Sequence, residues 1–348
     1  MRGLRLCQSL RTRHYQRAIT GPARSMSRED SIPHELRTAA EPRQNQLYPV
    51  RLSQVDQINP SIRLLRLALP SHDKKHPFTF QPGQWLDVHI PFIATAGGFT
   101  ITSTPADAQL LPSLESLGPP FGAEATAPAS QAHPPYVELA VQESPGNPPA
   151  AWLWKPQEEI LGQEINIRVG GSFVWPPTGV DIHRIQNVVF IAGGVGINPL
   201  ISILAHLHQT QSVRPLSVRF LYTSRLPPGQ ETASLDAVLD RVLFLPRLRE
   251  IIRSQALSRR LRISLDLFLT NSAPSLAATG PPTDLAIHSR RISEGDTRAA
   301  VDGDGEFDPQ GTVAYVCGPP QMTDEMVESL KGILGKAGDK RVFFEKWW

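Results

Sequence analysis

Two short motifs, about 120 residues apart, carry the residue types in this chain that are best suited to holding a ligand. The first is the run Gly193, Gly194, Val195, Gly196, Ile197, Asn198 and Pro199. The second begins at Cys317 and continues through Gly318 and Pro319. Both follow short apolar runs that read as strands, and ligands of open α/β sheets bind at the carboxyl ends of strands. We therefore interpret both motifs as parts of a ligand site.

The residues around the first motif predict a strand, a loop and a helix. Residues 188–192 are short, apolar and rich in β-branched side chains, as in a strand buried on both faces. Apolar residues recur at 200, 203, 204 and 207, which is helical spacing. Pro199 suits the first helical position, where its missing N–H costs nothing. Because the free N–H groups of a helix start attract anions, we interpret this unit as the seat of a dinucleotide.

The glycine motif alone does not decide between a ligand site and a tight turn. Glycines between a strand and a helix often serve only the turn. The motif also departs from the common GxGxxG pattern, because Pro199 stands where the third glycine would be. Support for nucleotide binding must therefore come from elsewhere in the chain.

The charge distribution argues against nucleic acid as a partner. The 348 residues hold 35 basic and 33 acidic side chains, but residues 1–28 contain seven arginines and no acid. The remainder has 28 basic and 33 acidic residues, which is a net charge of −5 (28 − 33). A mildly acidic body does not suit a polyanionic partner.

The arginine-rich start is typical of a mitochondrial presequence, and a disordered basic tail is the alternative. It lacks the apolar core of a secretory signal, and no run approaches the ~20 apolar residues of a membrane span. We therefore expect a soluble mitochondrial protein without a transmembrane segment. The two cysteines, Cys7 and Cys317, cannot form a disulfide framework, which suits a reducing interior.

The first half of the chain predicts an antiparallel β-barrel. Residues 1–46 are expected to be a presequence and linker. Short strands interrupted by proline and glycine are expected at 50–55, 62–69, 84–90, 98–102, 136–142 and 164–169. Such strands over about 130 residues suggest a small barrel, here placed at 47–182. Residues 105–135 are rich in Pro, Ala, Ser and Gly, and we expect a flexible insertion there.

The second half, residues 183–348, predicts a doubly wound parallel sheet. Strands are expected at 216–222, 262–269, 313–317 and 341–344, and helices at 235–252 and 321–334. Strands that alternate with helices favour parallel pairing through right-handed crossovers. A second low-complexity segment, 272–310, is expected to be a flexible insertion. The predicted fold is thus a barrel followed by a doubly wound α/β nucleotide-binding domain.

In this order of domains and motifs the chain resembles the ferredoxin–NADP reductase superfamily of flavin-dependent reductases. The glycine motif and the run from Cys317 to Met322 resemble that superfamily's two nucleotide signatures. The resemblance implies that Cys317 lies beside the nicotinamide as a catalytic residue. The alternative is a buried small side chain at the end of a strand.

On the barrel, the superfamily places an Arg-x-Tyr-Ser/Thr strand against the flavin. The matching piece carries over Phe99, which the resemblance places against the flavin ring, and Thr100, which it places near the reactive nitrogen. The arginine has no counterpart. The phosphate segment is matched loosely by residues 146–150, without its hydroxyl. Because hydrogen bonds to charged groups contribute ~1.5–3 kcal/mol, this departure would weaken a phosphate contact.

The last residues of the sequence narrow the resemblance to one family. The run Phe343, Phe344, Glu345, Lys346, Trp347 and Trp348, taken with the altered barrel strand, resembles the oxidoreductase NAD-binding domain-containing protein 1 family. The resemblance implies that Trp348 covers a flavin ring. Aromatic anchoring of a final strand is the alternative. The family carries a mitochondrial assignment but no established substrate.

The nicotinamide partner is expected to be NADH or NADPH. The strand after the glycine motif ends in Thr223, Ser224 and Arg225, without the acid that binds the ribose of NAD. Two hydroxyls and a guanidinium suit a 2′-phosphate, although the family name says NAD. The flavin is expected to be FAD, with FMN as the alternative. Metal-ligand spacing is absent.

These observations lead to one hypothesis and its rivals. The chain is expected to be an NAD(P)H-dependent flavin oxidoreductase that passes hydride to a bound flavin and on to an unidentified acceptor. Because the cofactors carry the reaction, the protein's share is positioning. The first rival is a sensor or assembly protein that binds NAD(P) and has lost flavin and catalysis. A cytochrome-b5-reductase-like enzyme with a haem-protein partner is the second.

Overall fold

The computed structural model describes residues 33–70, 77–109, 134–210, 215–226, 235–255, 260–271, 285–303, 305 and 307–347. Clustering of contacts divides the chain into residues 1–31 and 32–348, and all the described residues belong to the second unit. The predicted presequence and the candidate Trp348 therefore lie outside the described residues. So do residues 110–133 of the first predicted insertion and 272–284 of the second.

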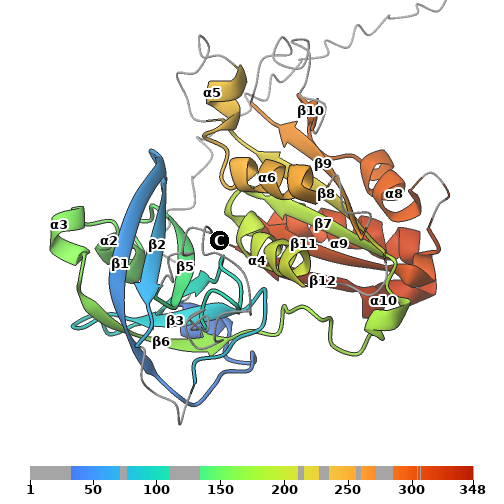
Figure 1. Ribbon diagram of the computed structural model, residues 1–348. Coiled ribbons are helices and arrows are strands. Elements are labelled where there is room, and N and C mark those ends of the chain that lie inside the picture. Colours follow the sequence, from blue (N-terminus) through green and yellow to red (C-terminus); the bar gives the residue numbers. More distant parts are fainter. Residues whose placement is uncertain are drawn as a thin grey trace, which may run out of the picture. The chain divides into compact units, whose positions relative to one another are not determined.

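The first half of this unit forms an antiparallel β-barrel, as predicted (Figure 1). Its strands are β1 Tyr48–Asn59, β2 Ile62–Ala68, β3 Trp85–His89, β4 Gly97–Thr100, β5 Tyr136–Gln142 and β6 Glu164–Gly170. They run in the order β4-β3-β6-β1-β2-β5, and a bridge from Ile101 to Leu139 joins the two ends. Two short helices, α2 Pro148–Leu153 and α3 Gln157–Ile160, lie between β5 and β6.

Alternation along the strands decides which barrel residues face the core. On β3, Leu86 and Val88 are buried in the barrel core, together with Phe99 and Ile101 from the β4 segment. Because successive strand residues point to opposite faces, Trp85 and Asp87 belong to the outer face of the sheet. There Trp85 pairs with Thr100 and Asp87 pairs with Gly98.

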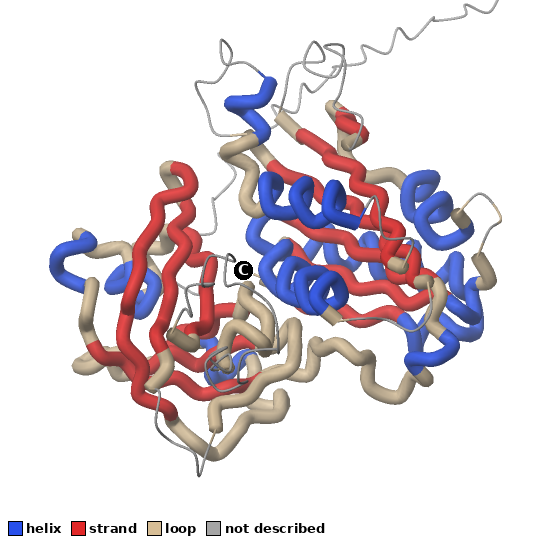
Figure 2. The backbone as a smooth tube through the Cα atoms, viewed as in Figure 1, coloured by secondary structure: helices blue, strands red, loops and turns tan. Residues whose placement is uncertain are grey.

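The second half forms a parallel sheet with helices on both faces (Figure 2). Its strands are β7 Asn187–Gly193, β8 Leu216–Ser224, β9 Leu261–Leu269, β10 Ala286–His288, β11 Thr312–Gly318 and β12 Val342–Lys346. Its helices are α4 Ile197–Gln209, α5 Leu235–Leu239, α6 Leu245–Gln255, α8 Glu294–Asp302, α9 Pro320–Leu334 and α10 Gly338–Arg341. Single 3-10 turns occupy Ile182–Arg184, Gly194–Gly196, Pro309–Gly311 and Gly335–Ala337.

The two faces of this sheet bury different residues of the same strands. Val188 and Phe190 of β7 belong to a core with α4 and α6, whereas Val189 and Ile191 belong to a core with α8 and α9. All seven residues of β7 are buried. Burial on both faces therefore explains why β7 is a continuous apolar run in the sequence, as expected of a central strand in a parallel sheet.

Two predicted helix boundaries are wrong. The helix predicted over 235–252 is two helices, α5 and α6, separated near Phe244, whose φ of 59° is incompatible with a continuous right-handed helix. The helix after the glycine motif begins at Ile197, so Pro199 is its third residue rather than its first. No backbone bond is lost, because the first four N–H groups of a helix have no partner within it.

The second predicted insertion is regular structure over part of its length. Within residues 285–303 the chain adds β10 to the sheet edge and forms α8. Ser293 caps α8, since its side chain accepts from the N–H of Asp296 while the Asp296 carboxylate accepts from the Ser293 N–H. Because the residues of α8 are mostly polar, apolar periodicity did not predict this helix.

The linker prediction is also wrong for residues 33–46. The helix α1 His34–Arg37 lies against β4, and Arg43 forms a bridge with Gly170. Arg43 donates to the Oδ2 atom of Asp87 at 2.9 Å, and Arg168 donates to the same atom at 2.8 Å. His34 Nε2 lies 3.3 Å from Asp87 Oδ1.

Asp87 is the fully buried centre of this cluster. Burial alone would raise the pKa of Asp87, but hydrogen bonds from His34, Arg168 and Arg43 hold it well below its usual range. The charge of Asp87 is therefore one of the contacts that bind residues 33–46 to the barrel, beside backbone hydrogen bonds such as that from the Gln44 N–H to the Val169 carbonyl.

Candidate functional site

The glycine motif and the second motif meet at the carboxyl ends of the parallel strands. The strand order is β10-β9-β8-β7-β11-β12. From β7 the chain adds β8, β9 and β10 on one side, and it then returns to add β11 and β12 on the other side. The topology therefore switches between β7 and β11, where open α/β sheets bind ligands at the carboxyl ends of strands. In this position Cys317 of β11 is the register partner of Ala192 of β7.

The contact between the motifs is closest at Gly196, where only glycine fits. A Cβ added to Gly196 would lie 2.1 Å from the carbonyl oxygen of Cys317. A Cβ on Gly318 would lie 3.2 Å from the Cα of Gly193, and a Cβ on Gly193 would lie 2.7 Å from the sulfur of Met322. These three glycines therefore hold the two motifs together rather than face an open space.

Gly194 is different from its neighbours. Its φ is 55°, it is exposed, and an added Cβ would meet no atom within 4 Å. Val195 is partly exposed, whereas Ile197 and Pro199 are buried. Of the predicted nucleotide-binding run, only Gly194 and Val195 thus present surface that a ligand could contact.

Asn198, also predicted to bind the nucleotide, is used by the protein itself. Its Nδ2 atom donates to the carbonyl of Ala140 on the barrel strand β5 at 3.0 Å. One turn later in α4, the Ser202 hydroxyl donates to the carbonyl of Ser103 at 2.7 Å. Both side chains are buried. They fix the helix that follows the glycine motif directly onto the barrel.

Thr223, Ser224 and Arg225 lie at the same sheet edge as the glycine motif. Thr223 of β8 is the register partner of Gly193, and Arg225 follows as an exposed residue. The Leu226 N–H donates to the Asn271 side chain at 2.7 Å, and Asn271 donates back to the Leu226 carbonyl at 2.8 Å. This reciprocal pair holds the backbone just after Arg225.

Cys317 lies in a sealed environment at the end of β11. It is fully buried and is the register partner of Glu345 on β12. Burial raises the pKa of the Cys317 thiol well above its ordinary value, the charge of Glu345 adds to this, and the Trp347 indole acts in the opposite direction. Cys317 is therefore a neutral thiol at physiological pH, and not a nucleophilic thiolate.

Glu345 is the functional candidate that sequence reasoning missed. The residue is partly exposed, but its Oε2 atom is sealed from solvent and has no hydrogen-bond partner among the described residues. Burial, with a contribution from the charge of Glu41, raises the pKa of Glu345 to about 8. The Trp347 Nε1 atom is likewise sealed, and its interaction with the Cys317 thiol is the one that lowers the pKa of that thiol.

A sequence signal for Glu345 existed. It is an acid two residues before Trp347, next to Phe343 and Phe344 in the strand that follows the second motif. Residues two apart share one face of a strand, so an acid and an indole are expected to point the same way if the strand continues to Trp347.

On the barrel, Thr100 offers another unpaired polar atom. It is 1% exposed, and its Oγ1 atom has no hydrogen-bond partner within the described ranges. It lies opposite Trp85, whose ring packs where Gly170 and Gly171 would carry a Cβ. A buried hydroxyl without a partner costs about 1–3 kcal/mol, which a bound ligand could recover.

Phe99, predicted to face a flavin ring, lies instead in the barrel core. Its side chain is 8% exposed and packs among the core residues of the barrel. A Cβ on Gly97, where the superfamily arginine would begin, would lie 2.5 Å from the Phe99 ring and 2.6 Å from Pro149. These two side chains therefore fill the space beside Gly97.

A partly buried ion pair joins the barrel to α6. Arg247 donates from Nη1 and Nη2 to the two carboxylate oxygens of Glu138 at 2.8 and 3.1 Å, and Thr102 donates to the same carboxylate at 2.9 Å. Glu138 is 3% exposed. Together with the bonds of Asn198 and Ser202, this pair holds the barrel strands near Thr100 against the helices beside the glycine motif.

Among the described residues, no helix combines the length and the apolar character that a membrane crossing requires. Nor does the described part of the chain contain three His, Cys, Asp or Glu side chains grouped to bind a metal ion.

Comparison with known proteins identifies close relatives by sequence. No protein-family model matches the chain. It is 30% identical over 323 residues to oxidoreductase NAD-binding domain-containing protein 1 of Bos taurus, covering 90% of this chain and 85% of the relative. The Xenopus laevis protein of that name is 29% identical over 334 residues, covering 95% and 89%. The reductase component of propane 2-monooxygenase from Rhodococcus jostii is 25% identical over 299 residues, covering 85% and 62%.

Solved structures share the fold at lower identity. Amycolatopsis cytochrome P450 reductase GcoB superimposes with a TM-score of 0.55 at 18% identity, covering 86% of this chain and 69% of that one. A ferredoxin NADP+ reductase from Neisseria gonorrhoeae with bound FAD and NADP gives a TM-score of 0.54 at 14% identity, covering 88% and 100%. The predicted ferredoxin–NADP reductase-like fold is therefore confirmed.

Proposed function

Because this chain belongs to the oxidoreductase NAD-binding domain-containing protein 1 family, we propose that it is an NAD(P)H-dependent flavin oxidoreductase. It passes hydride from the nicotinamide to a bound flavin, and the electrons go on to an acceptor that the chemistry of the site does not specify. The observation that carries the proposal is the contact of the glycine motif with Cys317 at the switch point of the sheet. Nothing but glycine could stand at Gly196, so this junction is built into the fold.

The residues at the sheet edge fit a nicotinamide dinucleotide. Gly194 and Val195 would contact the pyrophosphate at the start of α4, where the N–H of Ile197 already donates to the Gly194 carbonyl and Pro199 has no N–H to offer. Thr223, Ser224 and Arg225 would contact the adenosine ribose, and the absence of an acid there favours NADPH. Gly318 and Pro319 would line the nicotinamide end beside Cys317.

Two unpaired polar atoms, one on the C-terminal strand and one on the barrel, could pair with the polar edge of a flavin ring. Glu345 Oε2 and Thr100 Oγ1 are sealed atoms that lack a hydrogen-bond partner among the described residues. When bound, a flavin supplies hydride acceptance and onward electron transfer. With a pKa of about 8, Glu345 holds a proton at neutral pH and could donate a hydrogen bond or a proton.

The phosphate end of the site favours a second candidate. Phe99 and Pro149 occupy the space beside Gly97, where the superfamily carries an arginine. Helix α2 begins with Pro148 and Pro149, which have no N–H groups to offer a phosphate. A chain that binds NAD(P) as a sensor or assembly protein, without flavin, would be expected to lose this end of the site first.

An anaerobic titration separates the two candidates. The purified protein is incubated with FAD or FMN, freed of excess cofactor, and titrated with NADPH and NADH while the flavin absorption bands are followed. The enzyme hypothesis expects retained flavin that is bleached by one nicotinamide more readily than by the other. A colourless protein that still binds NADPH by calorimetry would establish the second candidate instead.

Two variants make the titration specific to the site. Thr100→Val keeps the shape of the side chain and removes its unpaired hydroxyl, and Glu345→Gln removes the titrating carboxyl. Both should slow bleaching or weaken flavin retention and leave NADPH affinity within about twofold, which is under 0.5 kcal/mol. Equal loss of both cofactors would mean that the substitutions disturb folding rather than the flavin site.

We also propose that the protein is mitochondrial and that residues 47–182 and 183–348 are its two working domains. The seven arginines without an acid in residues 1–28 support the location. Fusion of residues 1–46 to a fluorescent reporter tests it. A reporter that stays diffuse in the cytosol would refute the targeting role.

A further inference from the structure

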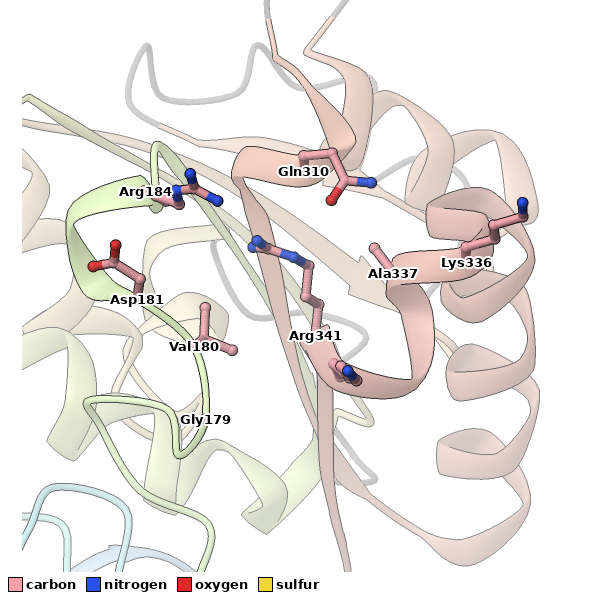
Figure 3. Close-up of a pocket in the computed structure, with 9 residues that line it drawn as sticks. Gly179, Val180, Asp181, Arg184, Gln310, Lys336, Ala337 and Arg341 are labelled. Carbon is pink, nitrogen blue, oxygen red and sulfur yellow. The ribbon is translucent and has the colours of Figure 1, made fainter.

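A cavity of about 400 Å³ lies on the nucleotide domain, outside the site described above (Figure 3). Such a volume falls within the range of small-molecule sites, about 300–1,000 Å³. Two segments far apart in the sequence supply most of its wall, the turn around Ile182–Arg184 and the segment that includes α10. Its lining residues are Gly179, Val180, Asp181, Arg184, Gln310, Lys336, Ala337, Lys340 and Arg341.

The cavity lies at the amino ends of β7 and β11, whereas the glycine motif lies at the carboxyl end of β7. Gln310 and Arg184 come just before β11 and β7 begin, whereas the glycine motif follows the end of β7. Six steps along β7, from Asn187 to Gly193, separate the two edges by roughly 20 Å at ~3.3 Å per residue. A ligand in this cavity is therefore separate from one at the glycine motif.

The cavity is positively charged in a protein whose body is acidic. Four of its lining residues are cationic and Asp181 alone is acidic, which leaves a net charge of +3 (4 − 1). Asp181 Oδ1 already accepts the N–H of His183. Asp339, next to Lys340 in the chain, pairs with Lys331 at 2.8 Å. The nearby acids thus do not neutralise the cavity.

Two guanidinium groups converge on the same space. Arg184 and Arg341 extend toward one another from the two walls, with Gln310 above them, whereas Lys336 points away toward solvent (Figure 3). Arg341 is held in place by a hydrogen bond from Nη1 to the Thr312 carbonyl at 3.4 Å. The backbone of Arg184 is fixed by its N–H bond to the Asp181 carbonyl at 3.0 Å.

Like charges that extend toward each other repel, so an anion bound between these two guanidinium groups would be stabilised by both. Planar guanidinium groups recognise phosphate and carboxylate in pairs of parallel hydrogen bonds. Without Lys336, three cations of the lining remain, Arg184, Lys340 and Arg341, and a terminal diphosphate offers them two adjacent anionic groups. Val180 and Ala337 add apolar wall for the remainder of such a ligand.

We propose that this cavity is a second ligand site of the protein, which binds a small molecule through a diphosphate group held by Arg184, Lys340 and Arg341. The site does not depend on flavin binding or on the oxidoreductase reaction.

Inorganic pyrophosphate is the probe that tests the proposal. Its binding to the full-length protein is measured by calorimetry at constant ionic strength, with sulfate as the single-anion comparison. The double substitution Arg184→Gln with Lys340→Gln neutralises two exposed cations that pair with no described acid. The expected result is binding that weakens at least tenfold in this variant and stays unchanged in the matched surface variant Arg291→Gln.

Lysine acetylation followed by mass spectrometry locates the bound anion. Pyrophosphate should protect Lys340 in the wild-type protein and leave Lys155, an exposed lysine of the barrel, as reactive as before. Pyrophosphate affinity equal in wild type and the double variant, no protection of Lys340, or sulfate binding as tightly as pyrophosphate would each overturn the proposal. A circular dichroism melt that matches wild type shows that the double variant is folded.

Discussion

Replacing Gly196 by alanine is the most direct perturbation of the junction between the two motifs. The new Cβ would lie 2.1 Å from the carbonyl oxygen of Cys317, 2.5 Å from its carbonyl carbon and 2.7 Å from the N atom of Gly318. All three are backbone atoms of β11, so no rotamer change relieves the clash. To reach even 3.0 Å, the glycine loop and β11 must separate by 0.9 Å (3.0 − 2.1).

The size of the effect follows from this displacement. Overpacking typically costs 1–3 kcal/mol, and a clash with immobile backbone belongs at the upper end, about 3 kcal/mol. For a domain of this size that lowers the melting temperature by roughly 6–12 °C. Because a misplacement of about 1 Å can cost on the order of 100-fold, NADPH-dependent reduction should fall by a similar factor.

Two other glycines provide matched controls. Gly194 has a φ of 55° but an added Cβ meets no atom within 4 Å, so Gly194→Ala pays only conformational strain, about 1–2 kcal/mol. Gly332 lies in α9 with open space around it, and Gly332→Ala should stabilise the helix by up to about 1 kcal/mol.

The assay is urea unfolding of the three variants together with NADPH binding by calorimetry. The predicted order of stability is Gly332→Ala above wild type, then Gly194→Ala, then Gly196→Ala, with the greatest loss of NADPH affinity in the last. If Gly196→Ala unfolds and binds like wild type, the close contact at Cys317 does not exist and the reasoning about the site fails.

Three further predictions concern titrating groups. Since the pKa of Glu345 is raised from its ordinary 4.5 to about 8, the unfolding free energy of wild type should decline as pH rises between those values, and Glu345→Gln should remove the decline; parallel urea curves at every pH would contradict this. Asp87 has a lowered pKa, so its stabilisation is present at neutral pH and is lost as pH falls below about 4. Asp87→Asn should cost about 3–5 kcal/mol by leaving Arg43 and Arg168 without their buried partner, and hydrogen exchange should rise in residues 34–44; unchanged exchange there would show that Asp87 does not hold this segment. Cys317 should resist iodoacetamide at pH 8 in the folded protein and react fully in urea, whereas equal rates in both states would rule out a buried neutral thiol.

Much of the fold could be predicted because its signals are local. The strand residues of β2, β5 and β11 differ from their predicted ranges by no more than about one residue at each end, since alternation and apolar runs depend only on neighbours in sequence. The helix predicted over 321–334 is found as α9, and the helix predictions were wrong only where local polarity or a single backbone angle determined the structure. Ser293 and Asp296 cap a helix that has little apolar periodicity, and the backbone of Phe244 breaks one that has it.

The sequence predicted only the part of the site that the motif residues form. Gly194, Thr223 and Arg225 do lie at one sheet edge, because parallel strands bring their carboxyl ends together. Asn198 was predicted to hold a nucleotide, but its side chain donates to Ala140, 58 residues earlier in the chain. No sequence pattern states which distant carbonyl an amide will meet.

Short-range patterns were thus sufficient for the two domain types and for the two motifs, because each depends on residues a few positions apart. The three-dimensional packing was needed to show that Gly196 touches Cys317, that Phe99 turns into the barrel core, and that residues 33–46 are tied to Asp87. Those contacts join residues that are far apart in sequence. Their formation is governed by burial and charge pairing, which no local pattern records.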